Sequence, residues 1–219
     1  MKHPLIIDYY TDILCVWAWI AQKRIDELEK NLGTKIKIHH RYVDIFGNTQ
    51  EKMQKQWQEK GGYQGFAKHV LDSVKDYEHA PINRKIWLEV RPTTSANAHL
   101  VLKAIELCYD KETAASLACT IRQAFFIDAK DISKLSTLYD IMQQNSLDEN
   151  LIRHAINTGE AMAMLMSDYQ SAKQQLLRGS PSYIINEGRQ TLYGNVGYRV
   201  LQANIEEVLN KPQNTASWC

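Results

Sequence analysis

Apolar residues change their spacing repeatedly along this chain of 219 residues, and the order of the changes defines its architecture. Residues 5–10 form a short, nearly continuous apolar run, which is typical of a buried strand. Residues 17–32 follow a helical period that Gly33 ends, and alternation over residues 35–42 predicts a second strand. This strand–helix–strand order predicts two parallel strands joined by a right-handed crossover.

A long helical block separates this unit from a second strand-containing unit near the end of the chain. Almost the whole stretch from residue 50 to residue 177 has helical spacing, with helices expected at 63–77, from Thr94 or Ser95 to 109, and at 111–127, 133–145, 148–157 and 159–177. After Pro181 the period changes again, and we expect two strands around a turn and then a helix, at 182–185, 186–188, 190–193 and 198–209.

The composition excludes several classes of function. The chain is 44% apolar and 23% charged with a net charge of +1, which is ordinary for a globular protein. Lysine and arginine are scattered, so we expect no nucleic-acid partner. No apolar stretch approaches a membrane span, and the one near residue 5 is too short for a signal-peptide core. We therefore expect a cytoplasmic protein without structural disulfides or a membrane partner.

Four cysteines are present, and they differ in context: Cys15, Cys108, Cys119 and Cys219. No pair has metal-ligand spacing, so no metal site is expected. Cys108 and Cys119 lie in helical stretches and are interpreted as small buried hydrophobes. Cys15 lies where a strand gives way to a helix, and the positive end of the helix dipole there favours the nucleophilic thiolate. We expect an exposed thiol with a lowered pKa.

Four strings, in order, resemble one family: D-Y-Y-T-D-I-L-C-V-W-A at 8–18, P-T-T-S-A-N-A-H at 92–99, A-F-F-I-D-A-K-D-I at 124–132 and R-G-S-P-S-Y-I-I-N at 178–186. They are similar to the DsbA-like thioredoxin-fold family, in particular to cytoplasmic FrnE-like oxidoreductases, which are related to 2-hydroxychromene-2-carboxylate isomerases and kappa-class glutathione transferases. The resemblance implies an α/β thioredoxin-like fold (βαβ and ββα) with a large inserted all-helical subdomain. It places the thioredoxin-like domain at 1–46 and 178–212, the insertion at 47–177 and a flexible tail at 213–219.

The resemblance also assigns residues to a site. It makes Cys15 the nucleophile, and Trp17 and Ala18 the rest of the active-site turn. It makes Pro181 a cis-proline facing that turn, so that the backbone of Ser180 can bind a substrate or glutathione. Without the resemblance, Pro181 would be interpreted only as the end of one element and the start of the next.

Two further polar residues are candidates for tuning the thiol. Asp12 precedes the first helix and is also explained as a local cap or loop anchor. His99 lies on a helix that is expected to face the thioredoxin half, where packing explains it equally well. We also expect residues 47–62 to form a lip over the site.

The chain departs from the family pattern at one decisive place. Two-thiol members carry C-x-x-C, but Ala18 stands where the second cysteine would be. The isomerase and transferase relatives usually carry serine where Cys15 stands. The first hypothesis is therefore a monothiol thiol–disulfide oxidoreductase that acts on protein disulfides and needs an external thiol such as glutathione. Glutathione would be a cosubstrate, with no tightly bound cofactor. Cys219 is a weaker candidate for resolving the mixed disulfide that Cys15 would form with a substrate.

Two alternatives stay open, and a homodimer is compatible with both. One is a glutathione-dependent transferase or isomerase that acts on a small organic electrophile. Met162, Met164 and Met166 could line an apolar pocket for it, although their spacing favours a place in the core. The other is a non-catalytic thioredoxin-like module that binds peptides, because a fold does not fix a function.

Overall fold

The computed structural model describes residues 3–210, and its elements follow the predicted order. The described strands are β1 (Leu5–Thr11), β2 (Ile36–Tyr42), β3 (Ser182–Ile185) and β4 (Gln190–Tyr193). The helices are α1 (Val16–Leu32), α2 (Thr49–Lys55), α3 (Gly62–Ser73), α4 (Ala96–Cys108), α5 (Lys111–Phe126), α6 (Leu135–Gln144), α7 (Glu149–Asn157), α8 (Glu160–Gln174) and α9 (Tyr198–Asn210). Each predicted helix and strand is present, but some ends differ: the helix predicted at 63–77 ends at Ser73, and the one predicted at 159–177 ends at Gln174.

The four strands form one sheet in the order β2-β1-β3-β4. β1 and β2 are parallel, and α1 connects them, as the strand–helix–strand pattern predicted. β3 runs antiparallel to both β1 and β4. In this register Ile7 lies opposite Ile38 on one side and Ile185 on the other, so the first apolar run forms the centre of the sheet.

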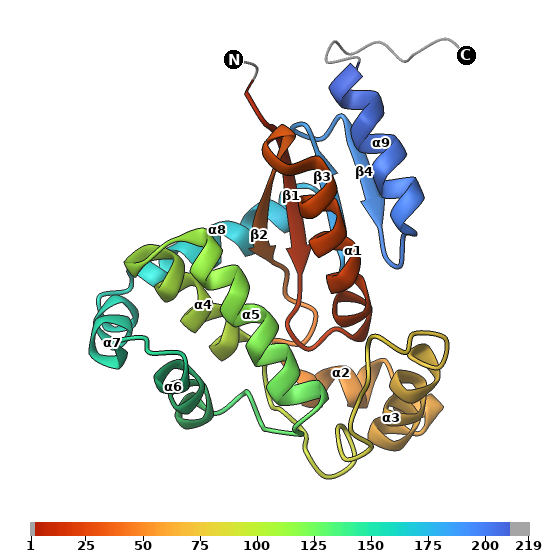
Figure 1. Cartoon of the computed structure of the whole chain (residues 1–219). Coiled ribbons are helices and arrows are strands. Elements are labelled where there is room, and N and C mark those ends of the chain that lie inside the picture. The colour runs from red at the N-terminus through yellow and green to blue at the C-terminus, as the bar shows by residue number, and fades with distance from the viewer. Residues whose placement is uncertain (1–2, 211–219) are drawn as a thin grey trace.

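Two helices cover one face of the sheet. α1 and α9 lie beside each other against it (Figure 1), and they bury a shared apolar cluster with alternate residues of the strands. That cluster includes Ile7 and Ile185 from the sheet, Ile25 from α1 and Ile205 from α9. All four side chains are at most 2% exposed, so their burial supplies hydrophobic stabilisation along the full length of β1.

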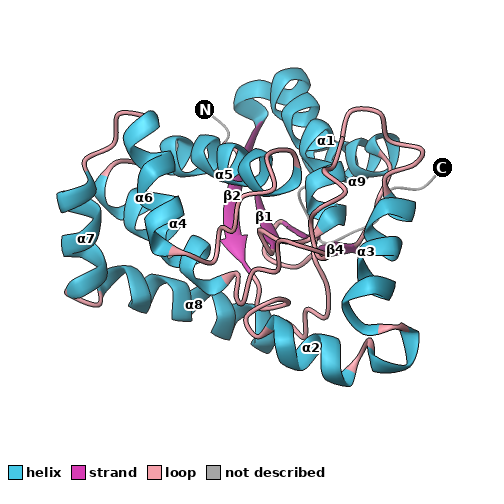
Figure 2. Cartoon of the chain, turned by 90° about the horizontal axis from the view of Figure 1, so that it is seen from below, coloured by secondary structure: helices cyan, strands magenta, loops and turns pink. Residues whose placement is uncertain are grey.

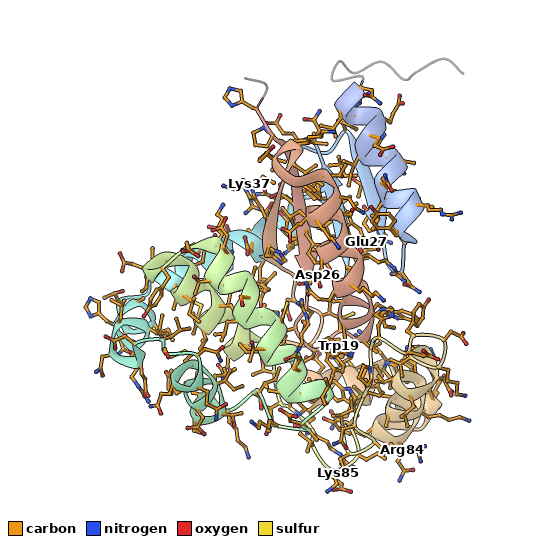
Figure 3. The ribbon with its side chains drawn as sticks, viewed as in Figure 1. Trp19, Asp26, Glu27, Lys37, Arg84 and Lys85 are labelled. Atoms are coloured by element: carbon orange, nitrogen blue, oxygen red, sulfur yellow. The ribbon has the colours of Figure 1, made fainter. Side chains whose placement is uncertain are left out.

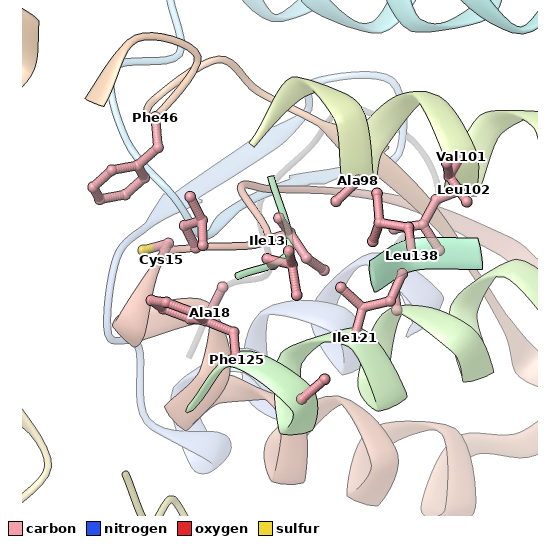
Figure 4. Close-up of a cluster of buried hydrophobic side chains, with 14 of the residues drawn as sticks. Ile13, Cys15, Ala18, Phe46, Ala98, Val101, Leu102, Ile121, Phe125 and Leu138 are labelled. Atoms are coloured by element: carbon pink, nitrogen blue, oxygen red, sulfur yellow. The ribbon is translucent and has the colours of Figure 1, made fainter. Parts of the chain in front are cut away.

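The segment between the two halves forms the largest apolar cluster of the described residues. Figure 2 shows α4 to α8 gathered on one side of the chain, with α2 and α3 on another. Their buried side chains pack around the turn after β1, so that Ile13 lies among residues of α4, α5 and α6 (Figure 4). The end of β1 that leads to Cys15 is therefore part of the core of the inserted helices.

Side chains also fasten the insertion to the first half of the chain. Trp19 lies at the end of α1 that adjoins the insertion (Figure 3), where its ring stacks on Phe126 with centroids 5.5 Å apart. Arg122, which is 1% exposed, donates to Thr11 Oγ1 at 2.9 Å and to Gln22 Oε1 at 3.0 Å. These contacts fix α5 against the end of β1.

The boundaries of the predicted domains, 1–46 with 178–212 and 47–177, stay a prediction. The tail predicted at 213–219, with Cys219, lies outside the described residues.

A buried carboxylate joins α8 of the insertion to the sheet and generates a first prediction. Asp168 is 2% exposed, accepts the Tyr42 backbone N–H at 3.1 Å, and pairs with Arg41 at 3.1 Å and Lys103 at 2.8 Å. Asp168→Ala leaves buried donors without this acceptor, so we expect a loss of about 3–5 kcal/mol in the free energy of unfolding. Urea unfolding followed by tryptophan fluorescence measures it.

Asp140 offers a matched control, because it lies on the exposed face of α6. Asp140→Ala is expected to change stability by less than about 0.5 kcal/mol. A loss below about 1 kcal/mol for Asp168→Ala would show that the ion pairs do little more than offset their own desolvation.

Candidate active site

Cys15 caps the N-terminus of α1. Its extended backbone (φ −79°, ψ 120°) ends the turn after β1, and its carbonyl accepts the first helical N–H groups, from Ala18 and Trp19, each at 3.1 Å. The side chain is 6% exposed, and its sulfur donates to the Ser180 carbonyl at 3.1 Å. Figure 4 shows the sulfur at the edge of the large apolar cluster. The thiol is therefore covered, but it lies at the border of the core.

Ser180 and Pro181 lie against this turn, although they are 165 residues further along the chain. The peptide bond between them is cis, as the resemblance implied. The Ser180 hydroxyl accepts the backbone N–H of Asp12 at 2.8 Å, while its carbonyl accepts the Cys15 thiol. Ser180 thus contacts the turn at two points, and the structure brings Cys15, Ser180 and Pro181 together.

The Asp12 carboxylate is fully buried and holds three segments in place. One oxygen accepts the Leu14 backbone N–H at 3.0 Å, within the turn. The other accepts the N–H groups of Ile45 and Phe46, at 3.0 and 2.9 Å, and the Ser95 hydroxyl at 2.8 Å. Burial raises the pKa of Asp12, and these hydrogen bonds oppose the rise. Local anchoring was therefore a correct but partial interpretation of this residue.

His99 contacts the same turn as a neutral side chain. Its Nε2 accepts the Ile13 backbone N–H at 3.0 Å, and its Nδ1 lies 2.9 Å from the Tyr169 hydroxyl. Burial, with Arg122 adding to it, lowers the pKa of His99 to about 3. Because the Nε2 lone pair is occupied, the 3.9 Å separation from Asp12 is not an ion pair. His99 supports the turn, and its tuning of Cys15 stays a prediction.

The expectation of an exposed Cys15 with a lowered pKa is wrong. Burial raises the pKa of the Cys15 thiol, and the Asp12 charge acts in the same direction. The Ser180 side chain and the N–H groups of Ala18 and Trp17 act against it. The helix dipole favours the thiolate, as expected. Desolvation of the thiolate, which is covered by segments distant in sequence, outweighs the dipole and raises the pKa.

The remaining turn residues differ in exposure. Ala18 is completely buried, so the place of a second thiol is filled by core packing. Trp17 is half-buried, and its ring meets His69 of α3 edge-on at 6.5 Å. His69 in turn packs against Trp57 at 5.1 Å. No sequence pattern marks His69, because only the folded chain places α3 beside the turn.

The segment predicted to form a lip folds into α2 and a short 3-10 turn at Gln58–Lys60. It approaches the site through Lys52, which the sequence analysis did not single out and whose amino group lies 4.9 Å from the Phe46 ring centroid. Met162 and Met166 are 43% and 38% exposed, so the core position is wrong for both, and the methionine-lined pocket stays a prediction.

Residues 3–210 contain neither a candidate metal-binding cluster nor a helix able to span a membrane. No group of three or more His, Cys, Asp and Glu side chains is arranged to hold a metal ion. No helix in this range has the length and apolar character that crossing a membrane requires.

A thioredoxin-type sheet with inserted helices, a cysteine at the first helix and a cis-proline beside it define a class of thioredoxin-fold proteins. The family model of the DSBA-like thioredoxin domain matches residues 6–206. The chain belongs to this family, and the predicted thioredoxin-like fold with a helical insertion is confirmed.

Individual relatives are distant. The ClpXP adapter protein SpxH of Halalkalibacterium halodurans is 22% identical over 224 residues, which cover 97% of this chain and 70% of the relative. The cytosolic disulfide reductase DsbM from Pseudomonas aeruginosa superposes with a TM-score of 0.70 at 16% identity, over 92% of this chain and 99% of DsbM, and a structure of DsbM with GSH matches at 0.66. A 2-hydroxychromene-2-carboxylate isomerase matches with a TM-score of 0.65 at 15% identity, over 94% of this chain and 97% of the isomerase.

The buried His99 and the half-buried His40 generate a pH prediction. Burial lowers the pKa of His99 to about 3 and that of His40 to about 4, below the value of about 6.5 expected in the unfolded chain. Above pH 6.5 both states leave these histidines neutral. As the pH falls from 6.5, the unfolded chain takes up protons that the folded chain does not, so stability falls. Between pH 6.5 and 5 each histidine contributes a loss of up to about 2 kcal/mol.

The replacement His99→Gln isolates one of these contributions. Glutamine retains an acceptor for the Ile13 N–H but does not titrate. The slope of the unfolding free energy against pH below 6.5 is therefore expected to decrease, by the equivalent of up to one bound proton. Urea unfolding at half-unit pH intervals measures this slope. An unchanged slope would mean that His99 does not titrate differently in the two states.

Proposed function

We propose that this chain is a thiol–disulfide oxidoreductase that uses Cys15 alone and an external thiol, glutathione. The observation that carries the proposal is the juxtaposition of Cys15, at the head of α1, with the Ser180 carbonyl 3.1 Å away beside a cis-proline. The buried Ala18 supports the one-thiol form, because it leaves no thiol in the turn to resolve an adduct. Use of glutathione fits the reducing environment of the cytoplasm, which is the proposed location.

The proposed reaction has two exchange steps. The Cys15 thiolate attacks the glutathione sulfur of a protein–glutathione mixed disulfide, so a Cys15–glutathione bond forms and the protein leaves as a thiolate that takes a proton. The thiolate of a second glutathione then attacks the bound glutathione sulfur. Glutathione disulfide leaves and the Cys15 thiolate is restored. The net reaction converts the mixed disulfide and one glutathione thiol into a protein thiol and glutathione disulfide, so one disulfide is exchanged for another and no bound cofactor is required.

The chain's own residues have defined parts in this scheme. The backbone N–H groups of Trp17 and Ala18 approach the Cys15 sulfur and stabilise its thiolate. The Ser180 backbone presents the docking edge for the extended substrate, next to the sulfur that reacts. Trp17 is only half-buried, so part of its side chain is available to a bound substrate.

A second candidate function is a non-catalytic, partner-binding module. The observation that favours it is the relative whose name describes an adapter protein, together with a Cys15 that burial disfavours as a thiolate. A glutathione-dependent isomerase or transferase is a third candidate, favoured by the structural match to an isomerase. The three differ in whether turnover occurs and whether it needs Cys15.

Cys15→Ser tests the first candidate directly. Turnover of a mixed disulfide between glutathione and a cysteine peptide is expected to fall by roughly 100-fold or more, because a hydroxyl cannot replace the attacking thiolate. Glutathione disulfide formation, coupled to glutathione reductase and NADPH, measures the rate.

Cys119→Ser is the matched control, because this half-buried thiol lies on α5 and not in the turn. It is expected to retain full turnover. Conjugation or isomerisation of an electrophile that survives Cys15→Ser would favour the transferase or isomerase, and saturable peptide binding without turnover would favour the module.

Ala18→Cys tests the one-thiol form. It places a second thiol three residues after Cys15, in the first turn of α1, where it can attack an adduct on Cys15. After treatment with glutathione disulfide, the parent chain is expected to hold glutathione on Cys15, whereas the variant is expected to form an internal disulfide instead. Mass spectrometry of the intact chain distinguishes the two. An adduct of equal amount in both would contradict the proposed role of position 18.

A further inference from the structure

Lys52 differs from the other basic residues of its helix. Its side chain is half-buried, its amino group lies 4.9 Å from the Phe46 ring centroid, and it donates to Gln56 at 2.9 Å. Lys55, one turn away, is exposed and pairs with Glu51 at 2.6 Å. The two lysines therefore share a helix but not an environment, and only Lys52 is directed toward the active-site end of the molecule.

Phe46, whose ring lies under Lys52, is connected to the turn that carries Cys15 by backbone hydrogen bonds. The Phe46 backbone N–H donates to the Asp12 carboxylate, and the Asp12 N–H donates to Ser180, whose carbonyl accepts the Cys15 thiol. Phe46 and Cys15 lie at the same end of the apolar cluster in Figure 4. These hydrogen bonds hold the Phe46 backbone next to the turn that carries Cys15, and Lys52 lies over the Phe46 ring.

The charges around Lys52 are mainly acidic. Half-burial lowers the pKa of Lys52, while the Asp12, Cys15 and Asp44 charges act against this and favour the charged form of its amino group. Asp12 also acts on Cys15, where it disfavours the thiolate. Lys52 and Asp12 therefore act on the Cys15 charge in opposite directions.

Other titratable groups near Cys15 stay neutral. The Tyr9 and Tyr183 phenols of the sheet interact electrostatically with Cys15, and burial raises the pKa of both. His99, beside Asp12, is neutral because its pKa is near 3. These groups add no positive charge that could stabilise a thiolate at neutral pH.

We propose that the ammonium group of Lys52 stabilises the Cys15 thiolate and so sets the pH at which this buried thiol becomes reactive. Lys52 is a positioning residue that acts through Cys15, and no contact with the sulfur or the substrate is required. The proposal rests on the proposed function of Cys15 as nucleophile. Under this proposal, a thiol that is 6% exposed and subject to the Asp12 charge loses its proton at a lower pH than it would without Lys52.

Lys52→Met tests the proposal in a chain whose other cysteines are serine. Methionine keeps an apolar stem over Phe46 but removes the charge, so the pKa of Cys15 is expected to rise by about 0.5 unit or more, which lowers the thiolate fraction at pH 7 about threefold. The rate of alkylation by uncharged iodoacetamide, measured against pH, gives this value. Circular dichroism melts establish that each variant is folded.

Two companion variants separate charge from structure. Lys52→Arg retains the cation and is expected to stay within about 0.2 unit of the parent. Lys55→Met removes an exposed charge from the same helix and is expected to have no effect, because solvent screens it. A folded Lys52→Met variant with the parent's alkylation profile would overturn the proposal, as would an equal shift in Lys55→Met.

The charge of the alkylating reagent gives a second readout. Iodoacetate is anionic, so the ratio of its rate to that of iodoacetamide is expected to fall in Lys52→Met, and this difference is expected to shrink in 1 M NaCl. An unchanged ratio would contradict a local field from Lys52. Neither measurement needs turnover, so a failure here leaves the effect of Cys15→Ser on the exchange reaction as an independent test of the proposed function.

Discussion

The active-site end of this protein depends on one buried carboxylate. The side chain of Asp12 binds the turn that leads to Cys15, the loop after β2 and the start of α4, and its backbone N–H binds Ser180. Each of these donors is buried, and each would lose a hydrogen bond worth about 1.5–3 kcal/mol if the acceptor were absent. Four segments that are distant in sequence therefore meet at a single residue, and the relative position of Cys15 and Ser180 follows from it.

Periodicity was enough to predict the elements, because strand and helix spacing is set by which side chains face the core. The site was predicted less completely. Asp12 could be interpreted from the sequence as a local anchor, since its bond to the Leu14 N–H spans two residues. Its bonds to Phe46 and Ser95 span 34 and 83 residues, and no local pattern encodes them. His99 was placed on the correct helix, but its partner Tyr169 lies 70 residues away.

The burial of Cys15 has the same origin. A helix N-terminus lowers the cost of a thiolate through its dipole and free N–H groups, and the sequence shows both. The Ser180 segment covers the sulfur only because Asp12 and the sheet register bring it there. Desolvation then outweighs the dipole and raises the pKa of Cys15. The sign of the shift is thus a tertiary property, although the residue that carries it was visible in the sequence.

A buried thiol and a buried Ala18 together constrain any exchange chemistry. Under the proposed function, the Ser180 carbonyl serves two partners in turn: the Cys15 thiol in the free protein and the backbone N–H of a docked substrate. When the substrate takes this acceptor, the thiol loses the hydrogen bond that favours its neutral form. Under this scheme, substrate docking and activation of the Cys15 sulfur are coupled through the Ser180 carbonyl oxygen. Because Ala18 offers no thiol, the adduct persists until an external thiol reaches the same covered position, so access to Cys15 controls both halves of the cycle.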